Sequence, residues 1–227
     1  MNLESFAKIY APRVQYEIIR EVSNLLVPVS GDIPILPVQF RPWLFRASLL
    51  YNSKSKDYSS IVLQIPKMKV ENKRDYLVSD EEQAKFELLL CHESAHYVHA
   101  KINQPETLRW RKSCEEFDRN KIRPVCHDTL LVSHEITAEF LAFWYIDRKQ
   151  GIENFLVRLD DEEKKPDGMY DKIQTVFLNT SRDKRDDLAR KLLVYPAEKI
   201  EEMTEFTHIF GNEKPHHLYC QQTFSFW

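Results

Sequence analysis

Residues 88–100 read LLLCHESAHYVHA, and this stretch decides how the rest of the sequence is interpreted. It places four ionisable side chains within about two helical turns, directly after an apolar run: His92, Glu93, His96 and His99. Ionisable groups beside an apolar run need solvent or a bound ion as their partner, because burying them alone is costly. The sequence on either side indicates which of the two environments applies.

The stretch belongs to a helix that the sequence predicts from residue 79 to about residue 103. Ser79 and Glu82 have the spacing of a capping box, and the acidic residues that follow Ser79 suit the positive end of the helix dipole. The sequence QPE, residues 104–106, ends the pattern. The quoted residues therefore lie in the second half of a long, capped helix.

His92 and His96 are spaced to bind one metal ion. On a helix, side chains four residues apart lie on one face with their Cβ atoms about 6 Å apart. Their imidazoles can then point at one ion, at about 2.0–2.1 Å for zinc. Glu93 lies about 100° around the helix from His92, where it can reach a water on the metal without being a ligand. The residues HESAH therefore match the HExxH motif, which predicts a zinc site with Glu93 as general base.

Two histidines leave a catalytic zinc site one ligand short, because such sites use three protein ligands and keep a fourth position open. The pattern with a glycine seven residues and a third histidine ten residues after His92 is excluded, since these positions hold His99 and Ile102. His99 lies on the same face as His92 and is expected near the metal, where it would orient a ligand or contact the substrate. It is also an alternative third ligand, although three ligands on one straight helix rarely converge.

A second helix, predicted from His127 to Gln150 with Gly151 as its stop, supplies a carboxylate. Its sequence HEITAEFLAFW places Glu135 and Glu139 four residues apart on a heavily apolar helix, where an unpaired carboxylate is costly. We expect Glu135 to be the third zinc ligand. We expect Glu139 to accept a hydrogen bond from the distal nitrogen of a ligand histidine and so to fix its orientation.

Composition limits the classes of partner. The 227 residues carry a net charge of −3, so no basic field points to nucleic acid or to an anionic membrane. Only four glycines are present, and no phosphate-binding motif is found. No signal peptide and no apolar run long enough to span a bilayer is recognised. We interpret the scattered cysteines as reduced thiols of a cytoplasmic protein, with a Cys114–Cys126 bridge left open: Cys91, Cys114, Cys126 and Cys220.

Other parts of the chain give weaker predictions. Residues 3–26 have helical spacing, with Pro12 at the start or at a kink of the main helix. The proline-rich residues that follow are expected to be extended chain and turns, and two strands come next, WLFRASLLYNS (43–53) and SSIVLQIP (59–66). Pro66 suits an edge strand that ends there. Helical patterns recur at about 152–165 and 183–205, whereas residues 106–120 fit either a helix or a loop.

The two motifs together carry a family resemblance. HExxH, followed some forty residues later by EITAE (135–139), resembles the gluzincin zinc metallopeptidases and their glutamate helix. The next residues, FLAFW, look like the continuation in the ImmA/IrrE-like group and in the soluble parts of Ste24/HtpX-like peptidases. The resemblance covers roughly residues 60–146. It implies a zincin-like α+β fold, in which a small mixed sheet packs on an active-site helix and a glutamate helix, and the edge strand of the sheet binds extended substrate. SSIVLQIP is in the matching place.

We therefore expect one zincin-like domain over residues 1–227, with a catalytic core at about 60–150 and a helical C-terminal part at 151–227. The expected function is a soluble zinc endopeptidase acting on peptides or proteins, in which zinc lowers the pKa of bound water and Glu93 transfers its proton to the leaving amine. The alternative is a non-catalytic, zinc-stabilised interaction module that keeps the helix pair. Glu93 separates the two, because a purely structural site has no use for it.

The C-terminal segment, FTHIFGNEKPHHLYCQQTFSFW, adds candidate groups for the same site. Donors to a developing oxyanion are usual in such sites, and the segment offers four candidates: His208, His216, His217 and Tyr219. Cys220 is a candidate fourth zinc ligand, because thiolates bind zinc well. The tail would then fold into the cleft and inhibit the enzyme. The alternative is that its aromatic residues simply pack on the core.

Overall fold

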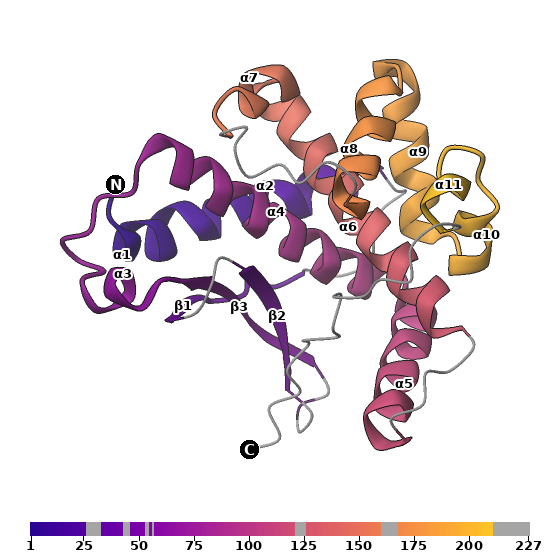
Figure 1. Cartoon of the computed structure of the whole chain (residues 1–227), viewed down its shortest axis with the longest axis horizontal. Coiled ribbons are helices and arrows are strands. Elements are labelled where there is room, and N and C mark those ends of the chain that lie inside the picture. The colour runs from indigo at the N-terminus through magenta and orange to yellow at the C-terminus, as the bar shows by residue number, and fades with distance from the viewer. Residues whose placement is uncertain are drawn as a thin grey trace.

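The computed structural model describes residues 1–25, 33–42, 46–52, 55, 57–120, 126–159 and 168–210. These residues form a mostly helical α+β structure with one small mixed sheet, which confirms the coarse fold class predicted from the sequence. In Figure 1 the sheet lies on one side of helix α4 and the C-terminal helices lie on the other. Helix α4 therefore stands between two structural layers.

The N-terminal segment is helical, as its spacing predicts. It consists of α1 (Leu3–Ser5), a π-helical turn η1 (Phe6–Tyr10) and α2 (Ala11–Leu25). The amide of Ala11 bonds to the carbonyl of Phe6 at the end of the π-helical turn. Pro12, which has no N–H to donate, follows at once, so the change of helix type falls where the proline interrupts the normal hydrogen bonding. The main helix α2 begins there.

The sheet contains β1 (Val38–Pro42), β2 (Arg46–Asn52) and β3 (Asp57–Ile65) in the order β1-β3-β2. Strand β3 pairs with β1 in parallel and with β2 in antiparallel orientation. Both predicted strands are present, but the prediction that SSIVLQIP is an edge strand is wrong, because β3 is central. Four successive side chains of β3 are buried, from Ser60 to Leu63, and such a run is typical of a strand covered on both faces.

Two long helices follow the sheet after the short α3 (Lys67–Glu71). They are α4 (Asp80–Ile102) and α6 (His127–Gln150), and their bounds agree with the predicted ones. The capping box of α4 is formed, since the amide of Glu82 donates to Ser79 Oγ at 3.2 Å and the amide of Ser79 donates to Glu82 Oε2 at 3.1 Å. Gly151 ends α6 with a φ of 79°, a conformation that favours glycine.

Helix α6 is the central helix of the molecule. From Leu130 to Ile146 every residue is buried except Glu135. One face of α6 packs on α4, and other faces pack on α8 (Met169–Asn179), α9 (Arg182–Val194) and α10 (Ala197–Glu201). A helix that is apolar on all sides must be enclosed by other elements. The sequence predicted one heavily apolar face on this helix. In the structure, neighbouring elements cover nearly the whole surface of the helix.

The C-terminal part is helical, but its bounds differ from the predicted ones. The remaining helices are α7 (Ile152–Leu156) and α11 (Thr207–Phe210). The helix expected at 152–165 therefore stops at Leu156, and the one expected at 183–205 is divided before Pro196, whose ring cannot continue a helix. Helix α8 was not predicted, although Ile173, Val176 and Phe177 have the spacing of a buried helical face.

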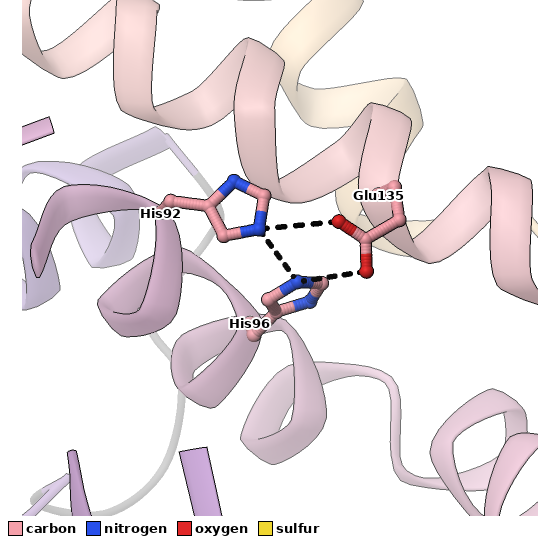
Figure 2. Close-up of side chains that lie close together, drawn as sticks. All are labelled: His92, His96 and Glu135. Carbon is pink, nitrogen blue, oxygen red and sulfur yellow. Dashed lines mark hydrogen bonds and ion pairs between the residues drawn. The ribbon is translucent and has the colours of Figure 1, made fainter. Parts of the chain in front are cut away.

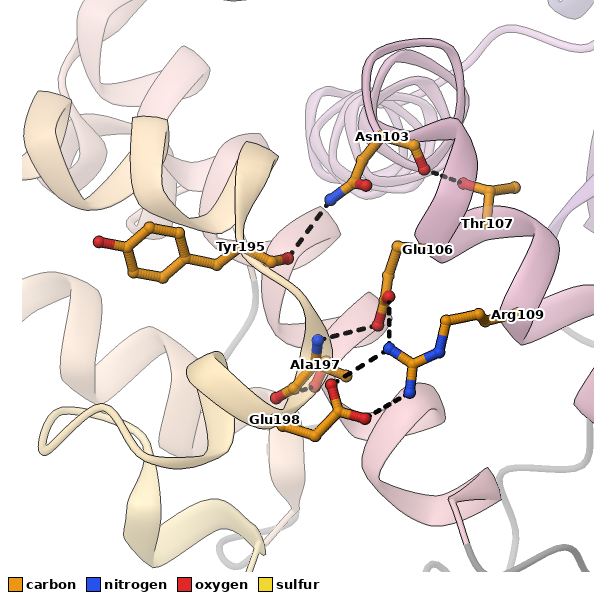
Figure 3. Close-up of polar contacts among 8 residues, drawn as sticks. Asn103, Glu106, Thr107, Arg109, Tyr195, Ala197 and Glu198 are labelled. Atoms are coloured by element: carbon orange, nitrogen blue, oxygen red, sulfur yellow. Dashed lines mark hydrogen bonds and ion pairs between the residues drawn. The ribbon is translucent and has the colours of Figure 1, made fainter.

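Residues 106–120, whose structure the sequence left open, belong to helix α5 (Gln104–Asn120). Its base is fixed to the C-terminal helices by the contacts drawn in Figure 3. The amide of Ala197 donates to Glu106 Oε1 at 2.8 Å, and Arg109 bonds both Glu106 and Glu198. The buried side chain of Trp110 joins a small apolar cluster with residues of α6. Helix α5 is therefore anchored at its first two turns.

Two further sequence predictions bear on the described part of the chain. No helix there is long and apolar enough to span a bilayer. Cys114 and Cys126, both within the described ranges, are not joined by a disulfide.

Candidate metal centre

The first two predicted ligands stand on one face of α4. The rings of His92 and His96 have their centroids 4.6 Å apart, and their Nε2 atoms are 3.0 Å apart. Figure 2 shows both rings directed at the same point between α4 and α6. The i, i+4 spacing of the motif produces this convergence, because it stacks the two side chains one turn apart.

Glu135 of α6 completes the group from the opposite side (Figure 2). Its Oε2 lies 3.2 Å from Nε2 of His92, and its Oε1 lies 3.5 Å from Nε2 of His96. Ligand atoms of a tetrahedral ion with bonds of about 2.05 Å are about 3.3 Å apart. The three predicted ligands are therefore brought together at separations that suit one metal ion.

Glu139 orients the first histidine. Its Oε2 lies 2.7 Å from Nδ1 of His92, and both side chains are buried. A carboxylate can only accept, so Nδ1 carries the hydrogen, and Nε2, which faces Glu135 and His96, is the nitrogen that would bind a metal ion. The hydrogen bond expected of Glu139 is thus present. It leaves His92 in the tautomer that a metal ligand needs.

The electrostatic field of the group favours a cation. Burial opposes the charged imidazolium, yet the carboxylates of Glu135 and Glu139 raise the pKa of His92 well above its usual value. Burial also acts to raise the pKa of Glu135, but His96 and His92 hold it well below its usual range. The carboxylate of Glu135 therefore remains ionised. Together with the imidazole nitrogens of His92 and His96, this carboxylate forms a donor set typical of a divalent metal site.

Glu93 lies on the side of α4 that faces the sheet. It is only 7% exposed, and the backbone of Leu49 in β2 is near enough to its carboxylate to favour the ionised form. Burial raises the pKa of Glu93, against the opposing effect of His92 and His96. Its oxygens are not part of the three-ligand group. Glu93 is therefore a buried carboxylate beside the ligands, with a pKa shifted toward the range useful for proton transfer.

Tyr170, at the start of α8, contacts the same group and was not predicted. Its hydroxyl donates to Glu135 Oε2 at 2.9 Å, and its ring centroid lies 5.9 Å from that of His92. Burial of this end of the side chain and the charge of Glu135 raise the pKa of Tyr170, so the phenol is a protonated donor at neutral pH. No local pattern marks Tyr170, because its partner is 35 residues away in the sequence.

His99 does not hydrogen-bond a ligand residue, and its predicted contact with a substrate stays a prediction. It is not part of the ligand group, and neither of its ring nitrogens has a hydrogen-bond partner in the described part of the chain. Burial lowers its pKa to about 3, so the ring is neutral. The reason is geometric: seven residues advance about 10 Å along a helix, which carries His99 past the ligands. Its ring instead lies 5.0 Å from that of His134, which contacts Trp110.

Of the candidate residues in the C-terminal segment, only His208 belongs to the described part of the chain. His208 is on α11 and is exposed. His216, His217, Tyr219 and Cys220 lie outside the described residues, as does the predicted inhibitory tail. The proposed roles of these residues stay predictions.

The geometry thus defines a candidate metal centre of two imidazoles and one carboxylate between two helices. No protein-family model, curated protein or solved structure matches the chain. The site itself therefore carries the functional argument.

Proposed function

We propose that the chain is a zinc-dependent endopeptidase of the gluzincin type, with a zincin-like arrangement of sheet, active-site helix and glutamate helix. The observation that carries the proposal is the position of Glu135, whose carboxylate lies 3.2 and 3.5 Å from the Nε2 atoms of His92 and His96. Two histidines and a glutamate, with a fourth position left open, are a ligand set of catalytic zinc.

The bound zinc, Glu93 and Tyr170 have separate roles in the proposed reaction. Zinc, when bound, supplies a Lewis acid that acidifies water and polarises the scissile carbonyl. Glu93 accepts the proton of the attacking water and delivers it to the leaving amine. Its burial supports this role, because a carboxylate with a raised pKa gives the proton up less readily to bulk water. Tyr170 is our candidate donor to the oxyanion that develops on the substrate, since its hydroxyl is already at Glu135.

The substrate would bind in extended form along β2. Within the described residues β2 pairs only with β3, so its other edge has no strand partner. The proximity of the Leu49 backbone to Glu93 brings this strand next to the proposed general base. A peptide that adds to the free edge by backbone hydrogen bonds would therefore pass the ligand group. The edge strand expected from the gluzincin likeness is β2 in this proposal.

The test combines metal analysis with peptide cleavage. Zinc-loaded wild type should cleave casein or a quenched fluorescent peptide, and Glu93→Gln should bind the same amount of zinc but lose about 10²- to 10⁴-fold in kcat/KM. Glu87→Gln is the matched control, because Glu87 is a buried carboxylate on the same helix outside the ligand group. Equal zinc binding with no cleavage by either protein would contradict the peptidase proposal and favour a zinc-stabilised interaction module.

A further inference from the structure

Arg111 of α5 extends across to the sheet and stacks on two tyrosines. Its guanidinium carbon lies 3.9 Å from the ring centre of Tyr51 and 4.8 Å from that of Tyr58. The two rings are themselves in edge contact, with centroids 5.6 Å apart. Stacking of this kind occupies the flat face of the guanidinium and leaves the N–H groups at its rim. Because α5 is anchored at its base (Figure 3), Arg111 is held by rigid elements on both sides.

The hydrogen-bonding capacity of Arg111 is not used up by its neighbours. Its Nε is buried without a hydrogen-bond partner, and no carboxylate within the described ranges forms an ion pair with it. Asp57, whose pKa the charge of Arg111 helps to lower, is bound instead by Lys101 at 2.7 Å through both oxygens. The buried Nε is out of reach of solvent, so an incoming acceptor would meet the terminal N–H groups of the same guanidinium.

The position of Arg111 relative to the ligand group follows from β2 and α4. Tyr51 comes two residues after Leu49, the residue whose backbone acts on the pKa of Glu93. Two residues of extended chain span about 6.6 Å, and the bulge between Leu50 and Tyr51 changes this only locally. On α4, Tyr97 lies one turn after Glu93 and its ring contacts Tyr58 at 5.9 Å. Arg111 therefore stands over the Tyr51–Tyr58 pair of β2 and β3, two residues along β2 from Leu49 and one turn of α4 from Glu93.

The ligand group is rich in carboxylates, so the charge of Arg111 bears on which substrates can bind. Glu93, Glu135 and Glu139 are all acidic, and the nearby Lys101 is neutralised by Asp57. A bound Zn²⁺ would offset two of these three charges, so the site as a whole offers a substrate carboxylate no excess of positive charge unless a separate cation receives it. Arg111 is placed to do so, and the planar guanidinium suits a carboxylate better than an ammonium would.

We propose that Arg111 is a specificity-determining residue that binds a substrate carboxylate two or three residues from the cleaved bond. This inference rests on the proposed peptidase function. The carboxylate belongs either to an aspartate or glutamate side chain or to the end of the substrate chain. Both sources offer the same planar acceptor, and the experiment separates them.

The experiment measures cleavage by the zinc-loaded full chain. A peptide mixture is digested and the cleavage sites are read by mass spectrometry, and matched peptides that carry Glu or Gln at the enriched position then give kcat/KM. Each peptide is made with a free and with an amidated C-terminus. Wild type should prefer the Glu peptide about 10- to 100-fold, the range expected for a hydrogen-bonded charge pair. A preference that depends only on the free C-terminus would assign Arg111 to the chain end.

Arg111→Met should lose the preference for the carboxylate, so that its kcat/KM values for the Glu and Gln peptides become alike, and Arg111→Lys should keep only part of the preference. Methionine retains an apolar stem over the two tyrosines, and circular dichroism checks the fold. Lys112→Met is the matched control, because Lys112 is an exposed cation on the same helix. Cleavage without any preference, or a preference unchanged in Arg111→Met, overturns the role of Arg111 and leaves the peptidase proposal standing. The absence of cleavage by wild type overturns the peptidase proposal, and this inference with it.

Discussion

Replacing Glu139 tests whether it holds a metal ligand in place. Nδ1 of His92 lies 2.7 Å from Glu139 Oε2, and the two residues are 8% and 6% exposed, so solvent cannot replace the lost acceptor. A hydrogen bond to a charged group contributes about 1.5–3 kcal/mol. At about 1.4 kcal/mol for each factor of ten, Glu139→Leu should weaken zinc binding about 10- to 100-fold. Glu139→Gln retains an accepting oxygen and loses only the charge, so its effect should be smaller, about 2- to 10-fold.

The assay is a competition between the protein and a chromogenic zinc chelator at pH 7.5, which gives the Kd of each variant. Glu87→Gln serves as the control, because it replaces a buried carboxylate of α4 that does not contact the ligands. Circular dichroism establishes that each variant is folded before its Kd is compared. A folded Glu139→Leu variant whose zinc Kd stays within about twofold of wild type would refute the reasoning.

The remaining predictions concern activity and stability. Tyr170→Phe removes the donor at 2.9 Å from Glu135 and should lower kcat about 100-fold with zinc affinity nearly unchanged; a loss confined to zinc affinity would instead assign Tyr170 to ligand positioning. Zinc at about 100 times its Kd should stabilise the fold by about 2.7 kcal/mol, visible as a Tm that falls on addition of a chelator, and an unchanged Tm would argue against the site. Burial raises the pKa of Glu87 in the folded protein, so stability that is present at low pH is lost as the pH rises through that pKa. The urea midpoint of wild type should therefore fall relative to that of Glu87→Gln between pH 4 and pH 8, and parallel profiles would contradict this. Ser79→Ala should cost about 1 kcal/mol of unfolding free energy, because it removes the cap of α4, whereas Ser181→Ala, at a helix start without a side-chain cap, should cost less.

The local features of the fold were accessible from the sequence because their causes lie within a few residues. The capping box of α4 joins Ser79 to a residue three positions away, and Gly151 ends α6 through its own backbone conformation. The convergence of His92 and His96 follows from helical spacing alone. Glu135 was accessible by a different route, since a carboxylate on an apolar helix requires a partner. These inferences need no knowledge of how the elements pack.

Everything that depends on neighbours distant in sequence was decided by the tertiary structure. The central position of β3 arises from its parallel pairing with β1. No sequence pattern in residues 38–42 predicts that pairing. Tyr170 reaches Glu135 only because α8 packs on α6, and Arg111 meets the tyrosines only because α5 turns back toward the sheet. His99, in contrast, is carried past the ligands by the rise of its own helix. Sequence periodicity fixes which face of an element a residue occupies, whereas only the packing of elements fixes what that face meets.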